Sequence, residues 1–141
     1  MPTKKPGIRV IDSKVPISIA AKSEHRLAHE KNKSGRLRYI VVNLQEATML
    51  ELHIKIDGQE VFSRTAQEVA AGQNNCLGIQ ATYGAGGMLQ CQIYTTNNYG
   101  IVLDFNSHPI EFTNELLIEI KNRHTTTAYS TQAAYGLYEI D

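Results

Sequence analysis

The stretch MLELHIKIDGQEVFSR, residues 49–64, constrains the fold of this chain more than any other segment. Apolar side chains occupy every second position from Leu50 to Ile56, with Glu, His and Lys between them. A period of two indicates a strand with one buried face. Asp57-Gly58 follows, and Asp-Gly between two alternating segments is a strong hairpin signal. The stretch therefore predicts two antiparallel strands in a sheet with one apolar and one polar side.

Similar strand signals recur along the chain, and turn residues separate them. The expected strands lie at residues 8–12, 15–21, 37–44, 50–56, 60–63, 88–96, 101–105, 110–112, 115–122 and 133–141. Long segments with helical periodicity are absent from the sequence, which excludes helical repeats and βαβ units. This pattern predicts an all-β protein, an antiparallel sandwich or barrel of about eight strands.

Four segments carry more specific expectations. LRYIVVNL, residues 37–44, is almost entirely apolar, which is typical of a central strand covered on both faces. Pro16 cannot donate to a strand ladder and predicts an edge strand or the start of a strand. Residues 22–36 are polar and charged, and we expect a long exposed loop there, with or without a short helix. In residues 65–73, Thr65 and Glu68 have the spacing of a helix capping box, so a short helix or a loop is expected.

The chain of 141 residues has the length of one domain. Residues 1–7, MPTKKPG, predict a flexible basic arm, and residues 8–141 predict a single sandwich domain. The sequence has no apolar run near the ~20 residues that span a bilayer, and its start does not resemble a secretory signal. A disulfide between Cys76 and Cys91 is one alternative. We expect instead that both are free, buried thiols of a cytosolic protein.

Charge is distributed unevenly although the formal net charge is zero. Residues 1–38 contain ten Lys or Arg and three acids, so the remainder of the chain is acidic. One hypothesis is that a basic segment contacts an acidic surface of another copy or another protein, through Lys4, Lys5 and Arg9. The alternative is that the charges mix on the folded surface. The sequence does not favour nucleic acid as a partner, because no aromatic residue accompanies the basic residues before Tyr39.

Residue types that support catalysis or metal binding are present without a recognised pattern. His25 and His29 are four residues apart and would share one face of a helix, but no third ligand is indicated. The glycines in YGAGG, residues 83–87, lack the Lys and the helix of a phosphate-binding loop. Asp104 and Glu111 are interpreted as solvated acids on strand faces. We therefore predict no catalytic residue, no metal ligand and no cofactor.

Tyrosines in loop-like segments are the remaining candidates for a binding site. Tyr83, Tyr94 and Tyr99 could form aromatic platforms for a sugar or for a partner protein. Tyrosine is equally common on the strand faces and in the cores of sandwiches, and that alternative stays open.

The segment HPIEFTNELLIEIKNRHTTTAYSTQAAYGLYEID, residues 108–141, resembles small jelly-roll proteins of tailed-phage virions. In those proteins a strand ending in I-x-I-K-N precedes a Thr-rich link and a final strand. The resemblance implies a jelly-roll fold and a non-enzymatic role in capsid decoration or cementing, or in the neck or tail. It implies copies of the same chain and other virion proteins as partners, no membrane, and assembly in the host cytoplasm.

Two other classes of function remain as alternatives. One is a carbohydrate- or receptor-binding module that uses tyrosines and loops rich in Asn and Gln, with surface glycans as ligands. The other is a small cupin-like enzyme with histidines gathered in a barrel. Glycan binding would favour the first alternative, and a stoichiometric metal would favour the second.

Overall fold

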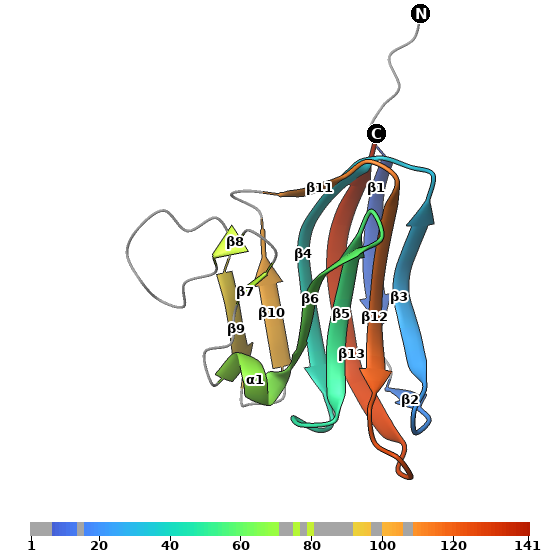
Figure 1. Ribbon diagram of the computed structural model, residues 1–141, viewed down its shortest axis with the longest axis vertical. Coiled ribbons are helices and arrows are strands. Elements are labelled where there is room, and N and C mark those ends of the chain that lie inside the picture. The colour runs from blue at the N-terminus through green and yellow to red at the C-terminus, as the bar shows by residue number, and fades with distance from the viewer. Residues whose placement is uncertain are drawn as a thin grey trace, which may run out of the picture.

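The computed structural model describes residues 7–13, 16–70, 75–76, 79–80, 92–96, 100–105 and 109–141. These residues form two antiparallel β-sheets that pack against each other, so the predicted all-β sandwich is confirmed (Figure 1). The described residues form thirteen strands, of which nine have five or more residues. The expected number was about eight, and the strands that lie outside the expected ranges are β3, Glu24–Lys31, and the two-residue strands β7, Asn75–Cys76, and β8, Ile79–Gln80.

The seven-stranded sheet lies behind the other sheet in the view of Figure 1. Its strands follow the order β1, β13, β4, β10, β9; β2 also pairs with β13, and β11 also pairs with β4. Their bounds are β1 Gly7–Ser13, β2 Ile17–Ile19, β4 Gly35–Leu44, β9 Gln92–Thr96, β10 Gly100–Asp104, β11 Ile110–Phe112 and β13 Tyr129–Ile140.

The four-stranded sheet has the order β3, β12, β5, β6 and forms the front layer (Figure 1). Its strands are β3 Glu24–Lys31, β5 Leu50–Ile56, β6 Gln59–Thr65 and β12 Glu115–Asn122. The helix α1, Ala66–Ala70, follows β6 directly, and the two-residue strands β7, Asn75–Cys76, and β8, Ile79–Gln80, pair with each other. Among the described residues, no helix is long and apolar enough to cross a membrane.

The hydrophobic core lies between the sheets and contains the side chains predicted by alternation. Leu50, Leu52 and Ile54 of β5 are completely buried, and so are the alternating apolar residues of β12. The cluster continues into the seven-stranded sheet through residues such as Ile40 and Leu103. Strands such as β5 and β12 therefore contribute every second side chain to one shared interior.

Asp57 and Gly58 form the predicted hairpin turn between β5 and β6. Their φ angles are 52° and 83°, which is the left-handed region favoured in such turns. The Asp57 carboxylate also accepts hydrogen bonds from the backbone N–H groups of Glu115 at 2.9 Å, Asn114 at 2.7 Å and Thr113 at 3.1 Å. These bonds, that from Glu115 first, lower the pKa of Asp57. The turn thus connects the β5–β6 hairpin to the start of β12.

The predicted capping box at the start of α1 is confirmed. The Thr65 backbone N–H donates to the Glu68 carboxylate at 3.0 Å, and the Glu68 N–H donates to the Thr65 hydroxyl at 3.2 Å. Pro16 immediately precedes β2, which confirms the expected start of a strand. Because β1 and β2 both pair with β13, they form one interrupted edge of the seven-stranded sheet.

The expectation of an exposed loop over residues 22–36 is wrong, because β3 occupies Glu24–Lys31 and pairs with β12. This strand forms an edge of the four-stranded sheet, where charged side chains are favoured because they oppose pairing with other chains. A register shift opposite Ile118 and Glu119 leaves Leu27 unpaired and interrupts the alternation. The charge and the irregular alternation together concealed the strand.

The expectation for residues 37–44 is correct in one part and wrong in another. β4 is central in its sheet, between β13 and β10, as predicted. Its side chains are not covered on both faces, because Leu37, Ile40 and Val42 are buried whereas Tyr39 and Val41 remain partly exposed. One side of this apolar strand therefore has no second layer within the described part of the chain.

Candidate functional site

An apolar surface on the outside of the seven-stranded sheet is the most unusual feature of the described structure. We call it the outer apolar face and define it by residues of four strands: Ile8, Val10, Tyr39, Val41, Val102, Tyr135 and Leu137. Among the described residues, the large hydrophobic side chains classed as exposed are Ile8, Val10 and Tyr135, and all three belong to this face.

Strand register places these side chains together. Val10 pairs with Leu137, which pairs with Tyr39 on its other side, and Asp104 of β10 ends this row beside Tyr39. The next row begins with Asp12 of β1 and continues through Tyr135, Val41 and Val102 across β13, β4 and β10. Each row is therefore apolar at its centre and has one carboxylate at its margin. Because directly opposed side chains in neighbouring strands lie on the same face, the rows form one contiguous surface.

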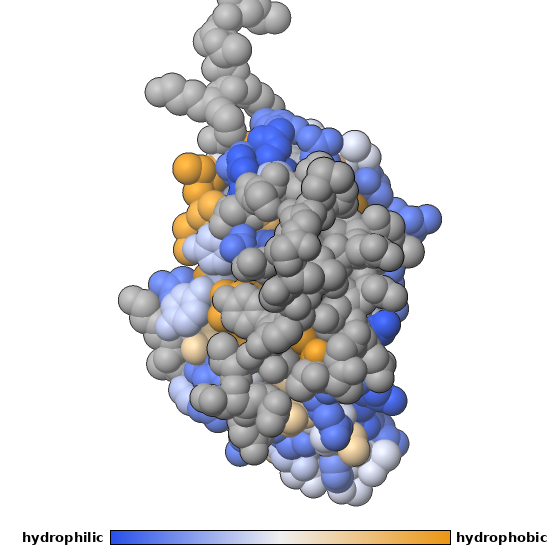
Figure 2. Space-filling model, turned by 90° about the vertical axis from the view of Figure 1, so that its left-hand side faces the viewer, coloured by the Kyte–Doolittle hydropathy of each residue, from blue (hydrophilic) through white to orange (hydrophobic). Residues whose placement is uncertain are grey.

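The exposure of the face is high for apolar residues. Ile8 and Val10 are each 66% exposed, and Tyr135 is 43% exposed. Figure 2 views the sandwich from the side, and hydrophobic atoms gather at the upper left margin, on the side of the seven-stranded sheet. Contiguous apolar surface on the outside of a soluble protein commonly marks a contact site.

Charged residues border the outer apolar face at the end where the C-terminus lies, and they are bonded to one another. Arg36 contacts Glu139 at 2.9 Å and Asp141 at 3.0 Å, while Arg38 contacts the other oxygen of Glu139 at 3.0 Å. The hydrogen bonds from Arg36 and then Arg38 lower the pKa of Glu139, and the bond to Glu139 raises the pKa of Arg36. Both guanidinium groups therefore already have carboxylate partners within the chain.

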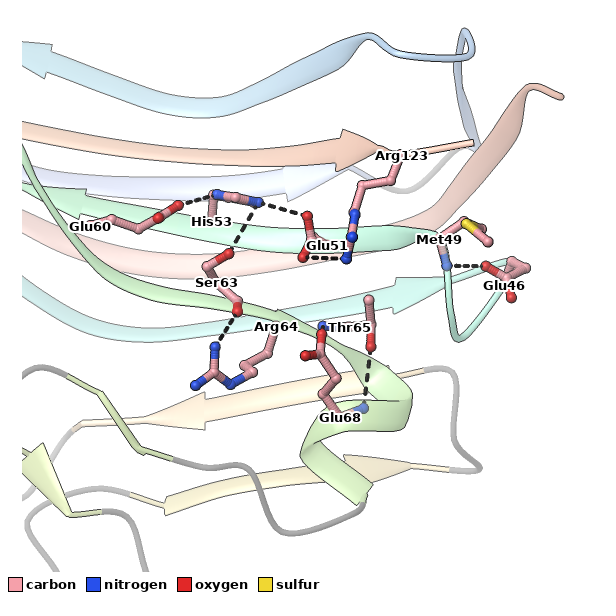
Figure 3. A network of polar contacts seen from close by, with 10 residues as sticks. All are labelled: Glu46, Met49, Glu51, His53, Glu60, Ser63, Arg64, Thr65, Glu68 and Arg123. Carbon is pink, nitrogen blue, oxygen red and sulfur yellow. Dashed lines mark hydrogen bonds and ion pairs between the residues drawn. The ribbon is translucent and has the colours of Figure 1, made fainter. Parts of the chain in front are cut away.

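The outside of the four-stranded sheet has the opposite character (Figure 3). His53 of β5 is only 7% exposed, and its ring lies between the carboxylates of Glu60 and Glu51, the latter at 3.2 Å. Ser63 lies 3.4 Å from the same ring, and Arg123 bonds Glu51 at 3.1 Å. The alternation in the sequence predicts that these polar side chains point away from the core. In the structure they form a hydrogen-bonded network with one another.

A pocket of about 420 Å³ lies at the end of the sandwich where β1 begins and the chain ends. Arg9 and Lys33 line it, and both form ion pairs with Glu30, at 3.8 Å and 3.6 Å respectively. Tyr138 donates a hydrogen bond to the same carboxylate, and burial, followed by the charge of Glu30, raises the pKa of Tyr138 to about 12. The basic groups of the pocket are therefore partly neutralised by Glu30.

The predicted partner-binding residues are only partly described. Lys4 and Lys5 lie outside the described residues, whereas Arg9 lies in β1 and contacts Glu30. The ion pairs of Arg36 and Arg38 with Glu139 join the basic N-terminal segment to the acidic remainder. At these described pairs the two charge populations mix, whereas a contact through Lys4, Lys5 and Arg9 stays a prediction.

The predicted ligand-binding tyrosines are largely outside the described structure. Tyr83 and Tyr99 lie outside the described residues, and Tyr94 is described only by its backbone, which pairs with Val102. The carbohydrate-binding alternative therefore stays a prediction. Cys91 also lies outside, and Cys76 is described only as part of β7.

The histidines considered for metal binding occur on a strand rather than on a helix. His25 and His29 both lie in β3, and the His29 ring contacts Glu115 at 3.0 Å. Within the described residues, no group of three or more His, Cys, Asp or Glu side chains could hold a metal ion. Asp104 lies at the end of β10, and the exposed Glu111 lies in β11.

Comparison with known proteins adds no identification, since neither a protein-family model nor a curated protein matches the chain. The fold and its faces define the class as an antiparallel β-sandwich. Sequence reasoning missed the outer apolar face, although a signal was present. In YGLY of β13, residues 135–138, apolar residues occupy both the inward and the outward positions of the strand. The same is true of IRVI in β1, residues 8–11.

Proposed function

We propose that this chain is a non-enzymatic structural protein of a virus particle that acts through protein–protein contacts. Decoration or cementing of a capsid, or a place in the neck or tail, is the role we favour, with assembly in the host cytoplasm. The proposal combines the resemblance of residues 108–141 to phage jelly-roll proteins with the outer apolar face. The single observation that carries it is the exposure of Ile8 and Val10 beside Tyr135.

The arrangement of this face supports a contact role. Specific interfaces have an apolar, aromatic centre and a polar rim. Here Tyr39 and Tyr135 each have an aliphatic residue on one side and an aspartate of the polar margin on the other. The Arg36–Glu139 pair lies at one end of the face. The face is built on central and edge strands of a sheet rather than on loops, so its shape is held by the fold. A rigid, preformed surface loses little conformational entropy when a partner binds.

Particles purified on density gradients from the cells that encode this chain provide the test. We expect quantitative mass spectrometry to find the chain in many copies per particle. A chain with Val10→Glu, supplied in place of the original, should be lost from the particles, because a charge would be buried without a partner. The matched control is Leu117→Glu, which places the same charge on the outside of the four-stranded sheet, between His29 and Lys55.

Two results would contradict this proposal. The chain could be absent from purified particles, which would remove the assigned role. Alternatively, particles could retain the Val10→Glu and Leu117→Glu chains equally. That result would show that the outer apolar face does not make the contact.

A further inference from the structure

We infer that the outer apolar face binds the same face of a second copy, so that two sandwiches pack face to face as a two-fold dimer. This inference rests on the proposed function, because it names the partner of the same surface. It goes beyond that function by assigning the contact to a defined sheet face, a defined partner and a defined symmetry.

The composition of β4 is the first argument. A strand with an almost uninterrupted apolar sequence is typical of a sheet covered on both faces. In β4 the inward residues are covered by the four-stranded sheet, whereas Tyr39 and Val41 are covered by no second layer in the described chain. Val102 and Leu137, their neighbours in β10 and β13, are also apolar and partly exposed. Polar residues, such as Arg36 and Asn43 in β4, occupy the two ends of this outer side. The middle of the sheet therefore has the sequence of a sheet with two covered faces, and the described chain covers one of them.

The size of the sheet is the second argument. The strands β1, β13, β4 and β10 are side by side and have seven, twelve, ten and five residues, respectively. At the usual spacing of strands and residues, these strands cover about 550 Å², so two copies face to face bury about 1,100 Å² in total. A specific interface buries at least about 1,000 Å² in total. Two such faces therefore have enough area for a specific dimer.

Charge is the third argument, and it favours a copy over an anionic partner. A nucleic acid or an anionic membrane surface selects cations that have no partner of their own. On this side of the molecule, Arg36 and Arg38 are both bonded to Glu139. Asp12 on β1 and Asp104 on β10 lie at the two margins of the face. The residues between them are aliphatic or tyrosine, so the surface that fits this centre is itself apolar with some aromatic groups. Another copy of the face has that composition, and a two-fold contact is self-complementary by construction.

The contrast between the edge strands supports this assignment. The apolar residues of β3 are partly or fully buried among its charged residues, whereas β1 carries Ile8 and Val10 at 66% exposure each beside its charged residues Arg9 and Asp12. Natural proteins usually blunt such an edge with charge. In a face-to-face dimer the exposed side chains of β1 become interior, at the ~10 Å separation of packed sheets.

Sedimentation of the purified full-length chain over a range of concentrations tests the inference. We expect a reversible dimer, and we expect Val10→Glu and Tyr135→Glu each to raise the dimer dissociation constant about 100-fold, because each change buries two charges per dimer. Leu117→Glu should leave the dissociation constant unchanged. Circular dichroism and urea unfolding of each variant establish that the sandwich is still folded.

Several outcomes would overturn the inference. One is a chain that is monomeric up to high micromolar concentration. Another is a dimer that persists in both Val10→Glu and Tyr135→Glu while both variants are folded. A trimer or a larger ring would exclude the two-fold face-to-face arrangement. The chain could also be monomeric and still be lost from particles when Val10 is replaced by Glu. That result would refute a second copy as the partner and leave the proposed function intact.

Discussion

The outer sides of the two sheets differ in whether their side chains find bonding partners within the described chain. On the four-stranded sheet, the buried His53 lies between Glu60 and Glu51, and Arg123 extends the network. On the seven-stranded sheet, Val10 and Tyr135 extend into solvent as apolar groups. The first side is complete within one chain, because its polar groups bond to one another. The second side would gain free energy by leaving water.

This difference shows that the same alternation of side chains can serve two purposes in one sandwich. Polar residues at the outward positions of β5 stabilise the folded chain and keep that side soluble. Apolar residues at the outward positions of β13 and β1 add little to the stability of the isolated chain, since folding does not bury them fully. We interpret the four-stranded sheet as the side that contributes to stability and the seven-stranded sheet as the side that contributes to assembly.

The largest effect is expected on the polar side. Replacing His53 with Ala removes the ring between Glu51 and Glu60 and leaves two carboxylates without this partner. We expect the free energy of unfolding to fall by about 2 kcal/mol, as measured by urea denaturation of dilute protein.

The matched control for His53→Ala is a truncation on the other side, Ile8→Ala. Because Ile8 is 66% exposed, its loss should change the free energy of unfolding of dilute protein by less than about 0.5 kcal/mol. Equal losses for the two variants would mean that the two sides do not differ in their contribution to stability.

A smaller effect is expected from the acid titration of Asp57. Hydrogen bonds from Glu115, Asn114 and Thr113 lower the pKa of Asp57 in the folded chain relative to the unfolded chain. This carboxylate therefore adds stability above its unfolded pKa, near 4, and that stability is lost as pH falls through the folded pKa. Asp57→Asn keeps a residue that tolerates the φ of 52° and should cost about 1 kcal/mol at neutral pH.

Urea unfolding of the original chain and of Asp57→Asn between neutral and strongly acidic pH provides the measurement. We expect the two stabilities to converge as the pH falls, because protonation removes the advantage of the carboxylate. Curves that stay parallel through the acidic range would show that Asp57 does not connect the β5–β6 hairpin to β12.

Local sequence patterns predicted much of the fold. Alternation from Leu50 to Ile56 identified β5 and its buried side, and Asp57-Gly58 identified the turn. The spacing of Thr65 and Glu68 predicted the cap that the structure shows. These features depend on neighbours within a few residues, and such neighbours are visible in a sequence.

Features that depend on pairing between distant strands could not be predicted in the same way. Whether Tyr39 is covered depends on which layers lie beside β4, and the alternation of one strand does not specify this. β3 is a strand because β12 pairs with it, while its own charged residues favour a loop. The partners of His53 are Glu51, two positions away, and Glu60, which the hairpin register brings beside it.

Covalent surface labelling at increasing protein concentration tests most directly whether the outer apolar face is a contact surface. We predict that labelling of Ile8, Val10 and Tyr135 falls as concentration rises, while labelling of Lys55 and Leu117 on the outside of the four-stranded sheet stays constant. Labelling that is independent of concentration on both sides, or that falls on the four-stranded sheet instead, would contradict the account.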